Sequence, residues 1–200
     1  MDFRQKEGRR VVEALRYAGV TIRSIDDLVN TKEPYPKAIP VLLELLPTVR
    51  DSRIKEGVVR ALTVKEAKGK AEQTLIREFR SISPDAAADL QGLKWAIGNA
   101  LSIVATDAVF NELVELATNK MHGKAREMVV MALGNMKNPK AGEVLVGLLS
   151  DEQVAGHAIT PILKFKYRPA LPQLEALRKH PNPWVRKKAE KAIIKLSNYK

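Results

Sequence analysis

Residues 169–196 read PALPQLEALRKHPNPWVRKKAEKAIIKL, and this stretch decides the fold. It contains two short amphipathic segments that are joined by a turn rich in Pro and Asn. Variants of the same pattern recur four times upstream, at residues 37–66, 70–104, 107–136 and 139–166. The sequence therefore predicts an array of helical hairpins that runs through most of the chain.

The first helix of every predicted repeat carries a small apolar residue that is followed four places later by Leu. The five pairs are Ala38 and Leu42, Ala71 and Leu75, Val109 and Leu113, Ala141 and Leu145, and Ala170 and Leu174. Residues four apart lie on one face of a helix, so each first helix has an apolar stripe.

The second helix of each repeat has an apolar anchor, then a base, and seven places after the anchor an Ala-Leu-like pair. These residues are Ile54-Lys55 with Ala61-Leu62, Leu93-Lys94 with Ala100-Leu101, Ala125-Arg126 with Ala132-Leu133, and Val185-Arg186 with Ala192-Ile193. The fourth copy is degenerate, with Val154-Ala155 and Pro161-Ile162. One hairpin cannot bury both stripes alone, whereas stacked hairpins bury a continuous core.

The repeats resemble HEAT repeats of the short bacterial kind, which read P-x-A-hydrophobic, then L-L, D-x-x-V-R and A-L. The resemblance is carried by Lys37 to Leu62 and by Pro169 to Ile193 and covers residues 37–196. It implies an all-α fold, an α-solenoid in which about five hairpins form a right-handed superhelix. It does not imply one function, because the family includes scaffolds, nucleic-acid binders, a few lyases and DNA glycosylases.

The expected organisation is an N-terminal helical cap at residues 1–36, followed by one continuous repeat array at residues 37–200. Val11 and Leu15 belong to the helical pattern of the cap. Ser83 and Pro84 predict that the second helix of repeat two begins near Pro84 and is the longest in the chain. Pro161 lies inside a predicted helix, where its missing N–H favours a kink.

Composition restricts the classes of partner and site. The net charge is +11, there is no Cys, and aromatic residues make up 5% of the chain. Disulfides and thiolate metal sites are therefore excluded. The N-terminal sequence lacks the apolar region of a secretory signal, so a cytoplasmic monomer without membrane insertion is expected. The charge favours an anionic partner or reflects a solvated surface, and both interpretations remain open.

In solenoids of the resembling family the second helices line a concave groove, and the positions opposite the core form its floor. Trp95, Met131 and Leu163 fall at such positions, and an exposed apolar patch marks an interaction site. The alternative is that the inserted segment around Ser83 covers Trp95. The other predicted groove residues are Asn99, Arg60, Lys187 and Lys191.

The bases that follow the apolar anchors form a ladder: Lys55, Lys94, Arg126 and Arg186. The ladder would track phosphates in a nucleic-acid binder. Its structural alternative is pairing with turn residues three before the anchor, where Asp51, Asp151 and Asn182 stand. Leu90 and His122 fill that place in repeats two and three, so Lys94 and Arg126 are expected to be freer to bind a partner.

No phosphate-binding Gly-rich loop and no close His pair occurs in the sequence, and no catalytic residue, metal site or cofactor is predicted. We expect a non-catalytic module that binds an acidic or helical protein segment in the groove. The alternative is a nucleic-acid-binding protein similar to HEAT-like alkylpurine DNA glycosylases. Trp95 and Trp184 would then stack on bases, although Trp184 is expected in a turn, and Asp89 or Glu127 would be the acid.

Overall fold

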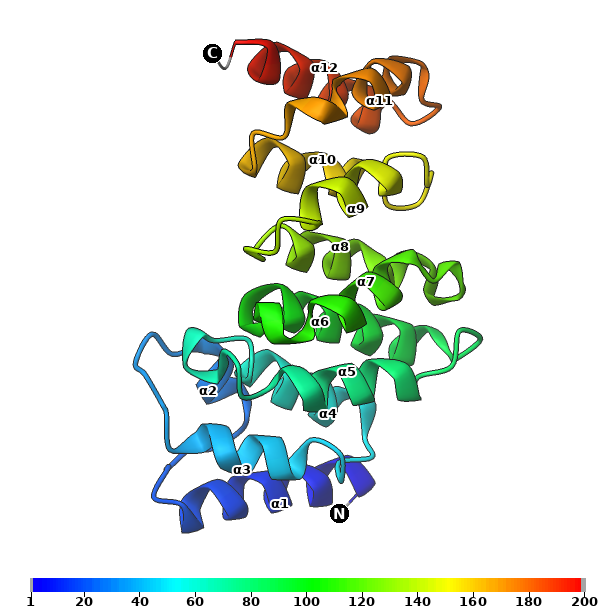
Figure 1. Cartoon of the computed structure of the whole chain (residues 1–200). Coiled ribbons are helices and arrows are strands. Elements are labelled where there is room, and N and C mark those ends of the chain that lie inside the picture. Colours follow the sequence, from blue (N-terminus) through cyan, green and yellow to red (C-terminus); the bar gives the residue numbers. More distant parts are fainter. Residues whose placement is uncertain (1, 199–200) are drawn as a thin grey trace. The chain divides into compact units, whose positions relative to one another are not determined.

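A computed structural model describes residues 2–198, so residues 1, 199 and 200 of the predicted cap and array lie outside it. Residues 2–198 form helices and no β-strand, which confirms the all-α class (Figure 1). The chain divides into two compact units, one that ends at Thr106 and one that begins at Asp107. This boundary falls between the second and the third predicted repeats.

The first unit contains an abbreviated hairpin and two full ones. Its elements are α1 (Phe3–Tyr17), α2 (Asp26–Asn30), α3 (Ala38–Leu45), α4 (Ser52–Ala61), the 3-10 segment η1 (Lys65–Ala67), α5 (Glu72–Ser81) and α6 (Ala88–Val104). Helix α1 packs on α3, α2 packs on α4, and α4 packs on α6. The predicted cap therefore adds one helix to the row of first helices and one short helix to the row of second helices.

The second unit contains three hairpins. Its elements are η2 (Asp107–Val109), α7 (Phe110–Thr118), η3 (Lys120–Ala125), α8 (Arg126–Leu133), α9 (Ala141–Leu148), α10 (Ala155–Lys164), η4 (Arg168–Ala170), α11 (Leu171–Ala176), η5 (Leu177–Lys179) and α12 (Pro183–Ser197). Helices α8, α10 and α12 pack successively against one another. They form a continuous row of second helices within this unit.

The core consists of the residues that define the repeat. The Leu of every first helix is 0% exposed, and these residues are Leu42, Leu75, Leu113, Leu145 and Leu174. Burial of one such side chain stabilises the fold by about 1.5–3 kcal/mol. Four of the five second-helix anchors are also buried, and they are Leu93, Ala125, Val154 and Val185. The fifth anchor, Ile54, stays partly exposed.

Turn residues satisfy the free N–H groups at the starts of second helices. The Asp51 carboxylate accepts hydrogen bonds from the backbone N–H groups of Arg53 and Ile54, at 3.1 Å each. The Asn182 side chain accepts one from the N–H of Trp184 at 2.9 Å. Asp51 and Asn182 therefore act as N-caps of α4 and α12.

Helix α6 differs from its prediction in where it begins. It is the longest helix in residues 2–198, as predicted, but it begins at Ala88 and not near Pro84. The preceding residues form a turn, and the Gln91 side chain donates to the carbonyl oxygens of Ser83 and Pro84 at 3.1 and 2.8 Å. Gln91 therefore fixes the inserted segment against the first turn of α6.

Helix α10 continues through Pro161 and ends at Lys164. The proline ring lies against Gly134, the residue that follows α8, where a Cβ atom would approach the ring to 2.6 Å. A glycine on the neighbouring second helix thus gives Pro161 the room it needs.

We predict opposite effects for two Gly→Ala substitutions in the first unit. A Cβ at Gly57 would lie 2.7 Å from Cγ2 of buried Ile25, whereas a Cβ at Gly92 in α6 meets nothing within 4 Å. Gly57→Ala should lower the free energy of unfolding by about 1 kcal/mol or more, because overpacking of about 1–3 kcal/mol exceeds the gain in helix propensity. Gly92→Ala should raise it by about 0.5–1 kcal/mol. Urea unfolding followed by circular dichroism measures both, and a stabilised Gly57→Ala variant would contradict the close packing of Ile25.

Candidate partner-binding surface

The outward face of α6 carries two exposed apolar side chains. Trp95 is 41% exposed and Ile103 is 43% exposed, while Asn99 between them is half-buried. The three residues are spaced four apart and therefore follow one another along the helix. Trp95 is exposed as predicted, and the inserted segment does not cover it. Ile103 was not among the predicted groove residues, although it lies eight positions after Trp95 and therefore on the same face of the helix.

Helix α4 packs beside α6 and contributes Arg60. This side chain is exposed and forms an ion pair of 2.6 Å with Glu56, one turn earlier on the same helix. Surface pairs of this kind contribute less than about 1 kcal/mol to stability. Arg60 is therefore accessible to a partner, but its charge is largely balanced by Glu56.

The row α8, α10 and α12 of the second unit holds the other predicted groove residues. Met131 on α8 and Leu163 on α10 are half-buried, and Lys187 and Lys191 on α12 are exposed. Adjacent second helices thus present apolar and basic side chains within this unit. We call the outward faces of α4 and α6 the second-helix surface of the first unit, and the outward faces of α8, α10 and α12 the second-helix surface of the second unit.

Trp184 does not lie in the turn, which corrects the sequence-based expectation. It is the second residue of α12, is 45% exposed, and rests on Gly156 of α10, where a Cβ atom would overlap the indole ring. The ring of His157 lies 5.3 Å away at a tilt of 51°. The pair Asn182-Pro183 is a typical N-cap and first helical position, so this signal could have placed Trp184 on the helix.

Lys188 fixes the other side of Trp184. Its ammonium group lies 4.3 Å from the centre of the indole ring and donates hydrogen bonds of 3.0 Å to the Gly156 carbonyl and the Thr160 hydroxyl. Burial lowers the pKa of Lys188. Burial also lowers the pKa of His157, where Glu127 opposes the shift and Lys188 adds to it. Trp184 is thus a positioned, half-exposed aromatic surface beside a cation.

Arg126 is not free to bind a partner, contrary to the prediction. Its side chain is 0% exposed. The guanidinium donates to Asp151 at 2.7 Å and to the Gln153 side chain at 2.8 Å, both from the next hairpin. It also donates to the backbone carbonyl of Ala117 at 3.2 Å. Arg126 is therefore a structural bridge between two hairpins.

The prediction that Lys94 is free to bind a partner is also wrong, because the Lys94 side chain is 0% exposed. Its ammonium group donates to the carbonyl oxygen of Ile82 at 2.6 Å and lies 5.0 Å from the centre of the Phe79 ring. Burial lowers the pKa of Lys94. This base stabilises the turn between α5 and α6 instead of facing solvent.

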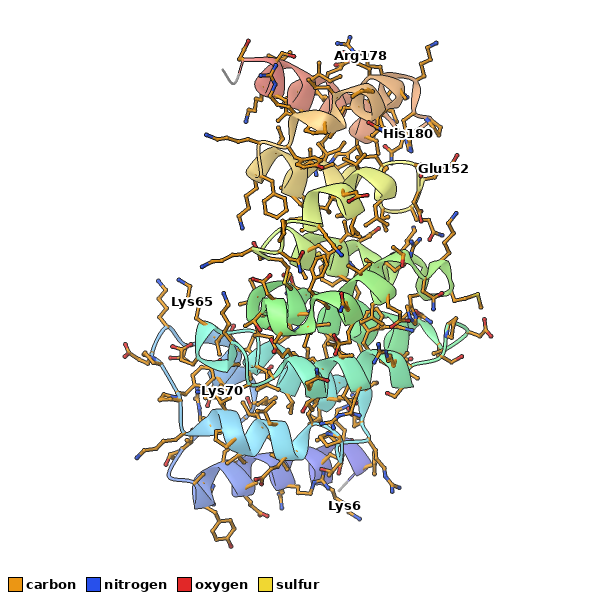
Figure 2. The ribbon with its side chains drawn as sticks, in the orientation of Figure 1. Lys6, Lys65, Lys70, Glu152, Arg178 and His180 are labelled. Atoms are coloured by element: carbon orange, nitrogen blue, oxygen red, sulfur yellow. The ribbon has the colours of Figure 1, made fainter. Side chains whose placement is uncertain are left out.

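The remaining bases of the ladder are also engaged. Lys55 forms an ion pair of 2.7 Å with Glu78 on α5, in the next hairpin. Arg186 donates to the carbonyl oxygens of His180 and Pro181 at 2.7 and 2.9 Å. All four bases therefore have structural partners, but none pairs with the turn residue three before its own anchor. The acids of Lys55 and Arg126 come from the following repeat, and Lys94 and Arg186 donate to backbone carbonyl oxygens. Exposed cations lie elsewhere, as Lys6 on α1 and Lys65 on η1 illustrate (Figure 2).

The two acids that the nucleic-acid alternative requires have different environments. Asp89 is exposed and accepts a hydrogen bond of 2.8 Å from the Ser52 hydroxyl, which lowers the pKa of this carboxyl group. This hydrogen bond engages Asp89 with Ser52, the first residue of α4. Glu127 lies 3.9 Å from Nε2 of His157. Trp95 and Trp184 lie in different units.

Metal-binding clusters and membrane-spanning helices are both absent from residues 2–198. This part of the chain holds no group of three or more His, Asp or Glu side chains that could bind a metal ion. None of its helices has both the length and the apolar character that crossing a membrane requires.

Comparison with known proteins shows the fold. No protein-family model matches the sequence, and the curated proteins give no match. The designed armadillo repeat protein YIII(Dq)4CqI is similar with a TM-score of 0.53 and 18% identity, over 98% of this chain and 94% of the designed one. A crystal structure of an engineered protein gives a TM-score of 0.52 and 18% identity, over 98% and 97% of the two chains.

A third similar structure is the designed armadillo repeat protein YIII(Dq.V1)4CPAF in complex with the peptide (KR)4. Its TM-score is 0.51 at 18% identity, over 96% of this chain and 92% of that chain. These likenesses define the class: the chain has the armadillo-type helical-repeat fold, in agreement with its resemblance to HEAT repeats. A fold of this class does not by itself specify a function.

We predict that Arg126→Met lowers the free energy of unfolding by about 3–5 kcal/mol, because it leaves the carboxylate of Asp151 without its cation. Arg178→Met removes an exposed ion pair with Glu175 and should change the free energy of unfolding by less than about 1 kcal/mol. Urea unfolding at pH 7 measures both variants, and equal effects would contradict the bridging role of Arg126.

The Arg126 bridge also predicts a pH dependence. Burial raises the pKa of Asp151, but hydrogen bonds from Arg126 and the Gln153 amide outweigh it and leave this pKa lowered. The resulting stabilisation is present above the unfolded pKa of about 3.9 and is lost as the pH falls through the lower folded value. Unfolding measured between pH 6 and pH 2 should therefore show a smaller loss of stability with acid in Arg126→Met than in the unmodified protein.

Proposed function

We propose that this protein is a non-catalytic binding module that holds acidic segments of another protein on the second-helix surface of each unit. The observation that carries this proposal is the exposure of Trp95 and Ile103 on α6, a helix whose opposite side is buried. Large apolar side chains held at the surface by a rigid helix are typical of interaction sites, and Trp is a frequent hot-spot residue.

The aromatic and basic side chains of α12, in the second unit, favour an acidic partner. Trp184 offers an aromatic face, and Lys188 is fixed beside it. Lys187 and Lys191 are exposed on the same helix. An aromatic contact provides affinity, while the ammonium groups attract carboxylates and disfavour a basic segment.

The peptide complex among the similar structures supports a peptide ligand for this fold. The peptide in that complex is the basic (KR)4. The present chain has a net charge of +11, so a peptide segment of complementary charge is negatively charged. The second-helix surface of each unit therefore fits a segment in which apolar residues alternate with Asp or Glu.

The nucleic-acid alternative remains as an outcome of the test. A phosphate-tracking ladder would need accessible bases, whereas Lys94 and Arg126 are fully buried. Phosphate-driven binding weakens steeply with salt, and apolar contacts do not. Salt dependence therefore separates the two functions.

We predict that Trp95→Ala weakens binding of a fluorescein-labelled peptide of alternating Leu and Glu by about tenfold or more, because hot-spot truncations remove about 2 kcal/mol. Fluorescence anisotropy at near-physiological salt measures the dissociation constant. The melting temperature should fall by only a few degrees, since Trp95 is 41% exposed. Tyr17→Ala is the matched control, because it removes an exposed aromatic residue from α1, and its affinity should equal that of the unmodified protein.

Three results would contradict this function. One is equal binding of the labelled Leu-Glu peptide by Trp95→Ala and Tyr17→Ala. Another is a large loss of thermal stability in Trp95→Ala, which would make Trp95 a core residue. The third is tighter binding of labelled single- or double-stranded oligonucleotides than of the peptide at near-physiological salt, which would favour the nucleic-acid alternative.

A further inference from the structure

The row of second helices in the first unit is incomplete at its N-terminal end. Helix α2 has five residues, whereas its neighbour α4 has ten. Ile25, directly before α2, lies against Gly57, the sixth residue of α4. The turns of α4 that precede Gly57 therefore have no second-helix neighbour on the side of the cap.

Ile54 lies in this uncovered part of α4. It is the one second-helix anchor of the five repeats that stays partly exposed in the described chain, whereas the other four are buried. Its contact on the cap side is Gly8 of α1, where a Cβ atom would lie 3.6 Å from Cδ1 of Ile54. An apolar core position is thus open to a ligand.

A groove of about 730 Å³ occupies the place of the missing turns. It runs between α1, the residues that lead into α2, and the start of α4. Its floor is apolar or small, and consists of Gly8, Val12, Ile25 and Ile54. This volume lies within the range of about 300–1,000 Å³ that is typical of ligand sites.

The rim of the groove is basic. It carries Arg4, Arg9, Arg16 and Arg23 against the two acids Glu13 and Asp26. Arg4 is paired with Asp51, and Arg23 is paired with Asp27. Arg9 and Arg16 are exposed, and within residues 2–198 their guanidinium groups form no ion pair. Two guanidinium groups on one helix are therefore available to carboxylates.

We propose that this groove binds an acidic amphipathic helix of a partner protein, which adds the missing second-helix turns beside α4. Apolar residues of the ligand at positions i, i+3 or i+4, and i+7 would cover Val12 and Ile54. Its flanking Asp or Glu residues would pair with Arg9 and Arg16. The site is separate from both second-helix surfaces and does not depend on their function.

Charge excludes a second copy of this chain as the occupant. The helix that ends the array, α12, would be the natural element to stack on α1 in a head-to-tail assembly. Its exposed residues include Lys187, Lys191 and Lys195. These ammonium groups would face the arginine rim, and like charges at an interface disfavour association.

The test uses designed helical peptides as probes. The first has Leu at i, i+3, i+4 and i+7 and Glu on its other face, and carries fluorescein. The second replaces every Glu by Lys, and the third has the composition of the first with the Leu positions scrambled. Fluorescence anisotropy with the full chain should show binding of the first peptide at least about tenfold tighter than of either control, and binding that weakens with salt.

Two charge-reversal variants test the rim. The double variant Arg9→Glu with Arg16→Glu should weaken binding of the acidic peptide by about tenfold or more, because both reversed charges would face the carboxylates of the peptide. Lys124→Glu with Lys179→Glu changes the net charge equally at exposed positions of the second unit that lie outside its second helices, and should leave binding within about twofold. Equal losses in both variants would mean general charge attraction and would overturn the proposal.

Gly8→Leu tests the floor without weakening the fold. A leucine side chain there would fill the groove above Ile54, and it raises helix propensity relative to Gly. Binding of the acidic peptide should be lost while the melting temperature stays equal or rises. Retained binding in Gly8→Leu, or no preference for the acidic peptide over the basic and scrambled ones, would overturn the proposal. Loss of binding in Trp95→Ala but not in Gly8→Leu would assign the helical peptide to the second-helix surface of the first unit, and would likewise overturn it while leaving the proposed function intact.

Discussion

Every hairpin depends on its neighbours to bury one leucine. The Leu of each first helix is 0% exposed in all five repeats, although a single pair of helices has too little apolar surface to enclose it. Within each unit a repeat is therefore stabilised by its neighbour. Val11 and Leu15 of α1, both 0% exposed, close the first-helix row at the N-terminus. The cap is an integral part of the core.

Close stacking also places bases inside the protein. Arg126 and Lys55 reach acids of the following hairpin, whereas Lys94 has a backbone carbonyl and an aromatic ring. A buried charge is tolerated only where such partners replace water, and removal of one partner leaves an uncompensated charge. Lys55 and Arg126 are balanced by their acids and leave the net charge of +11 unchanged, whereas buried Lys94 has uncharged partners and withdraws one positive charge from the surface.

The all-α class and the buried leucines could be predicted from sequence because both follow from helical periodicity. The partners of the bases could not, since Lys55 pairs 23 residues away and Arg126 pairs 25 residues away, across a hairpin boundary. The acid expected near Lys55, Asp51, caps α4 instead. For the candidate surface, periodicity correctly predicted that Trp95 is exposed. It could not predict the contact of Trp184 with Gly156, because that contact depends on how neighbouring helices stack.

The short length of α2 determines where the core stays open. A full second helix in the cap would cover Ile54 and make the N-terminal layer equivalent to the others. The chain instead crosses this region without a helix before Ile25, so α1 closes one row and leaves the other open. An open apolar layer normally invites self-association. In the proposed site the arginine rim would attract an acidic helix and repel the exposed lysines of α12, so the same charges would select the ligand and oppose self-association.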